Sequence, residues 1–187
     1  MARRSRPLGP LDLRAQAILR AVIEAAIEAG IDSLEHATYL APSHVPELVR
    51  RGSAVVPTLL IRDRVMLMVH RAGMPPDAIG EFLAAYGRLP GTVRLAAESG
   101  VIVLAGTDAG MVPHGRVSDE VEHLLAAGLD PDAAIGAASW AARRYLGLPG
   151  IEPGAPADIV AFARDPRIDP AVLAEPLRIV LDGRLVR

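Results

Sequence analysis

Polar residues recur at every fourth position in the first regular stretch of the chain, at residues 16, 20, 24 and 28. Isoleucine, leucine and valine side chains fall on the opposite side of the same stretch. This period is typical of an amphipathic helix and predicts one over residues 13–29. Gly30 supplies the left-handed residue that commonly ends a helix.

Three short apolar stretches then alternate with helical ones. They predict strands at 31–37, 54–58 and 101–105, with Pro57 at the end of the second. The third is a run of five apolar residues, and we expect it to be buried on both faces. Between these strands we expect a helix capped by Ser43 and ended by Gly52. The alternation indicates a parallel sheet or part of a barrel, although three strands close neither a barrel nor a doubly wound sheet.

The long segment between the second and third strands contains Gly73-Met-Pro-Pro76, Gly87 and Pro90-Gly91. We expect two or three helical pieces there, the last at 92–99. After the third strand, Ser118-Asp-Glu120 is interpreted as the cap of a helix to residue 127. Asp130-Pro131 then begins a helical pair that closes at Gly147.

The organisation changes after residue 148. A turn-rich segment over 149–156 is followed by predicted strands at 158–162, 177–181 and 184–187, the last two joined by the tight turn Asp182-Gly183. We therefore divide the chain into a barrel-type domain over 1–148 and a strand-only tail over 149–187.

Composition excludes several classes of protein. The net charge of −2 gives no reason to expect binding to nucleic acid or to an anionic membrane. The sequence lacks cysteine, lysine and asparagine, so thiolate sites, Schiff bases, P-loops and carbamylated lysine are impossible within it. The basic start is interrupted by Pro-Leu-Gly-Pro-Leu11, and no apolar run is long enough to span a membrane, so we expect a cytoplasmic protein.

Two residues stand at predicted strand ends. Asp108 follows the third strand and His36 lies at the end of the first. In sheets of alternating strands and helices, ligands bind at the carboxyl ends of the strands, so both are site candidates. An Asp after a strand also commonly caps a turn, and at this point both interpretations of Asp108 stay open.

An ordered set of motifs resembles the metal-dependent amidohydrolase superfamily, specifically the C-terminal half of the branch with imidazolonepropionases and prolidase-like enzymes. The set is Ser33-Leu-Glu-His-Ala37, Pro57-Thr-Leu59, Gly106-Thr-Asp-Ala-Gly110, Pro113-His-Gly115, Ala138-Ser-Trp-Ala-Ala-Arg143, Gly154-Ala-Pro-Ala-Asp-Ile-Val160 and Asp182-Gly-Arg-Leu-Val186. The resemblance implies an α/β fold: the C-terminal strands and helices of a (β/α)8 TIM-type barrel, followed by short strands of an incomplete β-sandwich.

The resemblance also implies roles for three residues. His36 matches the family's histidine ligand at the sixth strand, and Asp108 matches its aspartate at the eighth. Asp108 would be both a metal ligand and the catalytic residue that accepts the proton of the attacking water. The implied cofactor is a divalent metal, zinc being the one that such ligands suit. His114 is expected to contact the substrate, or else to be a solvent-facing loop residue.

The sequence also departs from the family. Its five histidines, at 36, 44, 70, 114 and 123, contain no His-x-His pair, and the bridging lysine cannot exist. The place of the fifth-strand histidine, before residue 13, contains none. Because catalytic zinc usually has three protein ligands, we expect weak or absent metal binding by this chain alone. A truncated product, a misplaced start or a frameshift would explain these departures.

The other polar candidates are expected to lie outside the site. His44, His70 and His123 are interpreted as surface or packing residues. Glu35 should point to the face of its strand opposite to His36.

Three functional hypotheses remain. The first is a hydrolase of carbon–nitrogen bonds in a small amide, cyclic amide or dipeptide-like substrate, inactive or weakly active without its other half. The second is a non-catalytic remnant or subunit that needs an N-terminal partner. The third is a half-barrel that binds a small ligand without metal. Because a partial barrel has exposed strand edges, we also expect oligomerisation or aggregation.

Overall fold

The computed structural model describes residues 13–71, 73 and 76–187. Its first helix, α1 (Leu13–Glu28), confirms the helix predicted from the four-residue period. Gly30 follows with a φ of 81°, the left-handed conformation expected of it. Residues 6–11, where the sequence lacks the family's histidine, and part of the expected break at 73–76 lie outside the described residues.

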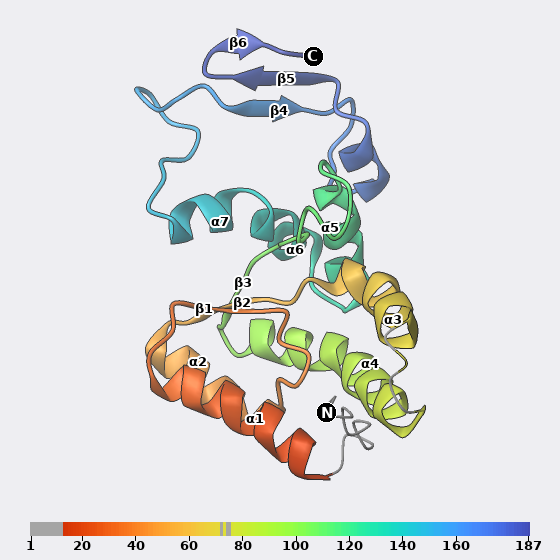
Figure 1. Cartoon of the computed structure of the whole chain (residues 1–187). Coiled ribbons are helices and arrows are strands. Elements are labelled where there is room, and N and C mark those ends of the chain that lie inside the picture. The colour runs from red at the N-terminus through yellow and green to blue at the C-terminus, as the bar shows by residue number, and fades with distance from the viewer. Residues whose placement is uncertain (1–12, 72, 74–75) are drawn as a thin grey trace, which may run out of the picture.

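Three parallel strands organise the body of the molecule (Figure 1). They are β1 (Ser33–Glu35), β2 (Ala54–Val56) and β3 (Ile102–Val103), in the order β1-β2-β3. All three strand predictions are confirmed, although each strand is shorter than predicted. β2 ends immediately before Pro57, as a residue without a backbone N–H requires in a central strand.

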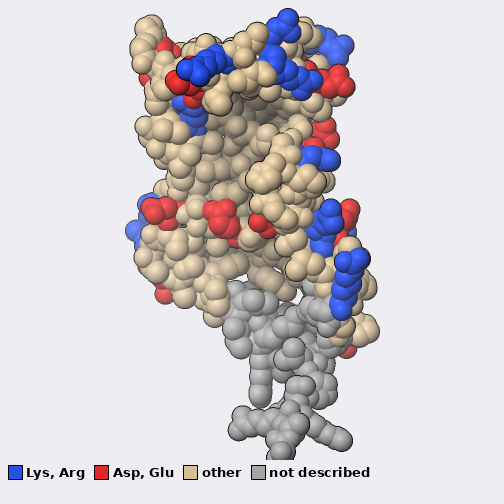
Figure 2. Space-filling view, turned by 45° about the horizontal axis from the view of Figure 1, so that its top comes forward, with Lys and Arg blue, Asp and Glu red and all other residues tan. Residues whose placement is uncertain are grey.

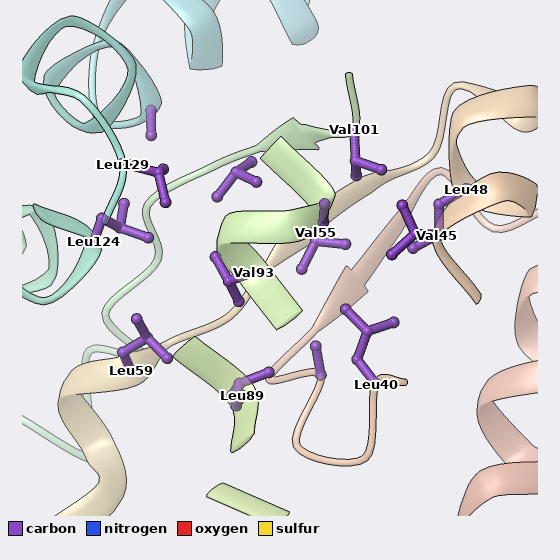
Figure 3. Packing of buried hydrophobic residues seen from close by; sticks show 14 of the residues in the cluster. Leu40, Val45, Leu48, Val55, Leu59, Leu89, Val93, Val101, Leu124 and Leu129 are labelled. Carbon is purple, nitrogen blue, oxygen red and sulfur yellow. The ribbon is translucent and has the colours of Figure 1, made fainter. Parts of the chain in front are cut away.

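Helices cover one face of this sheet (Figure 1). The long ones are α1 and α4 (Pro76–Glu98), and between β1 and β2 come a 3-10 turn, η1 (Pro42–His44), and α2 (Val45–Arg51). Leu34, Val55 and Val103 pair across the strands and point into a shared apolar core. Figure 3 shows this core, in which Leu48, Leu89 and Val93 from α2 and α4 are buried.

The opposite face is covered less completely. Ala54 in the central strand is buried, but Ile102 in β3 keeps 38% of its surface exposed. The prediction that the third strand is buried on both faces is therefore wrong. β3 is an edge strand of the described sheet, and Ile102 points to the face opposite to the buried Val103.

The segment between β2 and β3 also differs from the prediction. A 3-10 turn, η2 (Leu59–Ile61), leads into α3 (Arg62–Arg71), and α4 then continues as one helix through Pro90. The separate helix expected at 92–99 is therefore wrong. Leu89, Val93 and Ala96 are almost fully buried along one side of α4, and this continuous apolar contact outweighs the helix-breaking tendency of Pro90.

Three shorter helices follow β3: α5 (Val117–Ala126), α6 (Pro131–Ala137) and α7 (Trp140–Tyr145). Asp130 caps α6 as predicted, because its Oδ1 accepts a hydrogen bond of 2.9 Å from the Ala133 N–H. The predicted cap at Ser118 is wrong. α5 begins at Val117, after the N-cap residue Arg116, so Ser118 lies inside the helix, and both Ser118 and Glu120 are buried.

The tail forms a second sheet of three strands, β4 (Ile159–Ala161), β5 (Arg178–Leu181) and β6 (Arg184–Leu185). They are antiparallel, in the order β4-β5-β6, and confirm the change of organisation predicted for this region. Asp182 and Gly183 form the turn between β5 and β6 with φ values of 49° and 73°. A 3-10 helix, η3 (Pro170–Ala174), was not predicted and joins β4 to β5.

The surface between tail and body is hollowed, and Figure 2 shows charged side chains on both rims of the hollow. A cavity of about 540 Å3 lies between α7 and the segment after β4, lined by Trp140, Phe162 and Arg164 among others. Among the helices of the described residues, none combines the length and the apolar character needed to cross a bilayer.

Candidate functional site

Each of the three parallel strands leads to a non-glycine residue in the left-handed region of backbone conformation. These are His36 after β1, Thr58 after β2 and Asp108 after β3, with φ values of 62°, 50° and 51°. Such conformations cost about 1–3 kcal/mol each and persist only where the surroundings enforce them. Their occurrence at three neighbouring strand ends marks this edge of the sheet as the candidate site.

Backbone contacts to β2 hold the outer two strands. The His36 N–H donates to the carbonyl of Val56 at 2.8 Å, and the Leu104 N–H donates to the carbonyl of Val55 at 2.9 Å. Gly106 lies so close to β2 that a Cβ atom at this position would stand 2.4 Å from Cγ1 of Val56. The central strand therefore determines how far apart the ends of β1 and β3 lie.

The two predicted metal ligands are accessible and lie on alternate strands. His36 and Asp108 are both exposed, and β2 runs between the strands that carry them. The Asp108 backbone carbonyl accepts from the Met111 N–H at 2.9 Å, so this residue also begins a turn. The turn uses the backbone carbonyl and leaves the carboxylate accessible.

These residues do not by themselves make a metal centre. Across the part of the chain that the structure describes, no group of three or more histidine, aspartate or glutamate side chains is arranged to hold a metal ion. A catalytic zinc normally has three protein ligands. His36 and Asp108 have suitable donor atoms, but the described residues do not complete the set.

The remaining histidines take varied places. His44 is buried, where its Nδ1 accepts from the Ala41 N–H at 3.1 Å and its Nε2 lies 3.6 Å from Glu24. His70 and His123 are exposed on α3 and α5. His44 therefore has the packing role predicted for it, and the other two are surface residues. His114 is exposed in the turn before α5, and its contact with a substrate stays a prediction.

Glu35 lies on the incompletely covered face of the sheet and is exposed. Its Oε1 accepts a hydrogen bond of 2.6 Å from the Ser33 hydroxyl, the neighbour two positions away on the same face of β1. Because His36 lies beyond the end of β1 with a left-handed φ, strand alternation does not relate the two side chains, and the prediction that Glu35 points to the opposite face stays a prediction.

Glu120 is the principal residue that the sequence interpretation missed. Its side chain is completely buried, and its two carboxylate oxygens accept from the N–H groups of Leu59 and Leu60, both at 2.9 Å. Burial raises the pKa of Glu120 to about 7, because the loss of hydration outweighs the two backbone hydrogen bonds that lower it. One signal was present: Glu120 stands four residues before the buried Leu124, on the apolar side of α5.

Tyr86 of α4 is also buried. Burial raises the pKa of its phenol, and a hydrogen bond with the Thr38 side chain opposes this. The negative charges of Glu120 and Asp108 raise the pKa further, which places both carboxylates within electrostatic range of the phenol. Beside it, a cavity of about 400 Å3 lies between the loop after β1 and α4, lined by Tyr39 and Arg88 among others.

Among relatives, an uncharacterised protein of Mycobacterium tuberculosis is 42% identical over 159 residues, which are 84% of this chain and 43% of that protein. An uncharacterised protein of Mycobacterium bovis matches with the same identity and coverage. The chain thus spans less than half the length of the curated relatives it matches.

Solved structures agree with this similarity. A Xaa-Pro dipeptidase with bound methionine in its active site superposes with a TM-score of 0.73 and 27% identity, over 88% of this chain and 42% of that one. The putative prolidase of Bifidobacterium longum superposes with a TM-score of 0.75 and 28% identity, over 88% of this chain and 44% of that one. The sequence profile of the amidohydrolase family matches residues 15–186, nearly all that the structure describes. The chain therefore belongs to the amidohydrolase family.

Proposed function

We propose that this chain supplies the His36 and Asp108 side of an amidohydrolase active site, in which β1, β2 and β3 are the last three strands of a (β/α)8 barrel. The observation that carries the proposal is the left-handed backbone of His36, Thr58 and Asp108 at the ends of three neighbouring parallel strands. Energetically costly backbone at a ligand-binding edge is typical of catalytic residues. The exposed, apolar tail strands then belong to a β-sandwich that further strands complete.

The proposed reaction is hydrolysis of a carbon–nitrogen bond in a small amide, cyclic amide or dipeptide-like substrate. Similarity to a Xaa-Pro dipeptidase supports this class. The accessible carboxylate of Asp108 would accept a proton from the attacking water and transfer it to the leaving amine. His114, exposed in the loop that follows, is proposed to contact the substrate.

Metal binding is proposed to need ligands from outside these 187 residues. Histidine and aspartate suit zinc, but two ligands are too few to hold it tightly. We therefore expect the chain alone to bind a divalent metal weakly or not at all and to be a weak catalyst or none. The partner would be an N-terminal half of the barrel, with a second copy of the chain as the other candidate.

A second candidate function is binding of a small ligand without metal. The cavity of about 400 Å3 beside Tyr39 and Arg88 favours it, because this cavity opens directly after β1. The two candidates differ in what they require. Hydrolysis requires metal and a complementing polypeptide, whereas ligand binding requires neither.

The test is co-expression of this chain with the part of the Mycobacterium tuberculosis relative that it does not match. We expect the complex to retain zinc, measured by elemental analysis, and to hydrolyse Xaa-Pro dipeptides. His36→Ala and Asp108→Ala should each abolish hydrolysis, whereas His123→Ala, an exposed change on α5, should leave it unaltered. Retention of about one zinc per chain by the uncomplemented protein would contradict the proposal.

A further inference from the structure

Glu120 occupies an unusual place for a carboxylate, since it is fully buried and makes its two hydrogen bonds to backbone N–H groups of a distant segment. Leu59 and Leu60 are the first residues of η2, and α3 continues directly from it. The first N–H groups of a helical segment have no partner within the helix. Glu120 therefore supplies from another element the acceptors that a local cap would normally provide.

No local cap replaces it. Thr58, the residue before η2, makes no side-chain capping hydrogen bond to η2. Its hydroxyl instead donates to the carbonyl of Val56 at 3.4 Å. Thr58 also has the left-handed φ of 50°. The costly conformation that ends β2 is thus adjacent to the two N–H groups that Glu120 holds.

The effect extends to the neighbouring strand ends. Gly106 packs against Val56 and lies close to Thr58, two positions before Asp108. His36 is bonded through its N–H to the carbonyl of Val56, at the same end of β2. α5, which carries Glu120, follows the loop that begins at Asp108. Any shift of the turn after β2 would therefore move both flanking residues.

We infer that Glu120 is a positioning residue of the candidate site: its carboxylate holds the turn after β2, and that turn sets the relative placement of His36 and Asp108. The inference rests on the proposed function where it calls these two residues the site. The claim that Glu120 holds the turn does not depend on that function, because it concerns only which contacts keep the three strand ends in place.

The test compares Glu120→Gln with the matched control Glu122→Gln in the full chain. Both substitutions replace a carboxyl group of α5 with an amide, but Glu122 is exposed. Glutamine has one acceptor oxygen where the carboxylate has two, so Leu59 or Leu60 should lose its partner. We expect hydrogen-exchange protection of at least one of these amides to fall about 10- to 100-fold in Glu120→Gln and to be unchanged in the control.

A second readout separates positioning from simple capping. The imidazole NMR signals of His36 should shift or broaden in Glu120→Gln, while those of His44, buried beside Glu24 of α1, should stay in place. Loss of amide protection with an unchanged His36 signal would overturn the inference, and so would unchanged protection. If Glu120→Gln does not fold, Glu120→Asp takes its place under the same criteria, because it keeps the charge but is one methylene too short to reach both amides.

These readouts use neither metal nor substrate. They therefore decide the role of Glu120 even if the complemented chain hydrolyses nothing. Conversely, if the complex is active and Glu120→Gln leaves both kcat and KM unchanged, the inference fails while the proposed function stands.

Discussion

The two sheets of this molecule have equal numbers of strands but are stabilised in different ways. The parallel sheet β1-β2-β3 packs one face onto helices, and Val55 at its centre is completely buried. The antiparallel sheet β4-β5-β6 carries large apolar side chains on both faces, yet Leu185 on one face and Leu181 on the other keep 65% and 59% of their surface exposed. Apolar sequence alone therefore does not produce burial, which also requires a partner layer.

The same contrast separates the two sheets functionally. The body holds its strand ends in costly conformations, which requires a rigid and buried support. The tail is joined to the body through η3, where Val172 is buried and Leu173 packs against the core, and through partly exposed contacts such as Arg143 with Asp158 at 3.8 Å, but its sheet itself is exposed. We expect substitutions of equal size to have large effects in the body and small effects in the tail.

The largest difference should come from removing one leucine side chain in each region. Leu124 is completely buried between α5 and the core, so Leu124→Ala should lower the free energy of unfolding by about 2–5 kcal/mol. Leu185→Ala, in the exposed β6, should change it by less than about 0.5 kcal/mol. Urea unfolding followed by circular dichroism measures both. Equal losses would mean that the tail sheet is buried in solution and would remove the contrast.

The second difference concerns pH and compares Glu120 in the body with Asp165 in the tail. The pKa of Glu120 is raised from 4.5 to about 7 by burial, so the folded state binds this proton more tightly than the unfolded state. The contribution of this group to the free energy of unfolding is fully present below pH 4.5. It falls by about 3 kcal/mol as the pH rises to 7. Asp165 behaves oppositely, because hydrogen bonds from Arg167 lower its pKa from 3.8 to about 2.

Urea unfolding at pH values between 4.5 and 7.5 measures how the titration of Glu120 changes the free energy of unfolding. Glu120→Gln should flatten the decline, because an amide does not titrate there, while Glu122→Gln should retain it. The small contribution of the partly exposed Asp165 is confined to pH below 4, so the two effects fall in separate pH ranges. Stability that rises between pH 5 and 7 in the wild-type chain, with no change in Glu120→Gln, would show that burial does not dominate at Glu120.

What the sequence predicted correctly depends on local patterns. The period of α1, the left-handed Gly30 and the cap at Asp130 involve residues only a few positions apart, so composition and spacing suffice. The strand ends that carry His36 and Asp108 were also predicted, because turn residues mark them.

The errors arise where contacts between residues far apart in the sequence determine the local structure. Glu120 accepts a hydrogen bond from an N–H group 61 positions away, and its place on the apolar side of α5 indicates burial but does not identify this partner. α4 continues through Pro90 because the buried contacts along one side of the helix stabilise the helix. Ile102 is exposed because no further strand of the described chain lies beside β3. Each outcome depends on tertiary packing that the sequence does not display locally.

The smallest difference compares two glycines, Gly106 beside β2 and Gly150 in the segment before the tail. A Cβ atom at Gly106 would stand 2.4 Å from Cγ1 of Val56, whereas one at Gly150 meets nothing within 4 Å. Gly106→Ala should therefore cost about 1–3 kcal/mol through overpacking. Gly150→Ala should be neutral or stabilise by about 0.4–1 kcal/mol, because alanine restricts the unfolded chain.

Thermal unfolding of the two variants measures these changes. Combining Gly106→Ala with Val56→Ala then tests whether the contact with Val56 causes the loss of stability. Removing the two methyl groups of Val56 creates the space that the new Cβ needs, so Gly106→Ala should cost less in the Val56→Ala background than in the wild-type chain. An equal cost in both backgrounds would place the strain in the backbone rather than in the contact between β2 and the segment before Asp108. A reduced cost would show that close packing on β2 fixes the approach of Asp108 to the central strand, a constraint absent around Gly150.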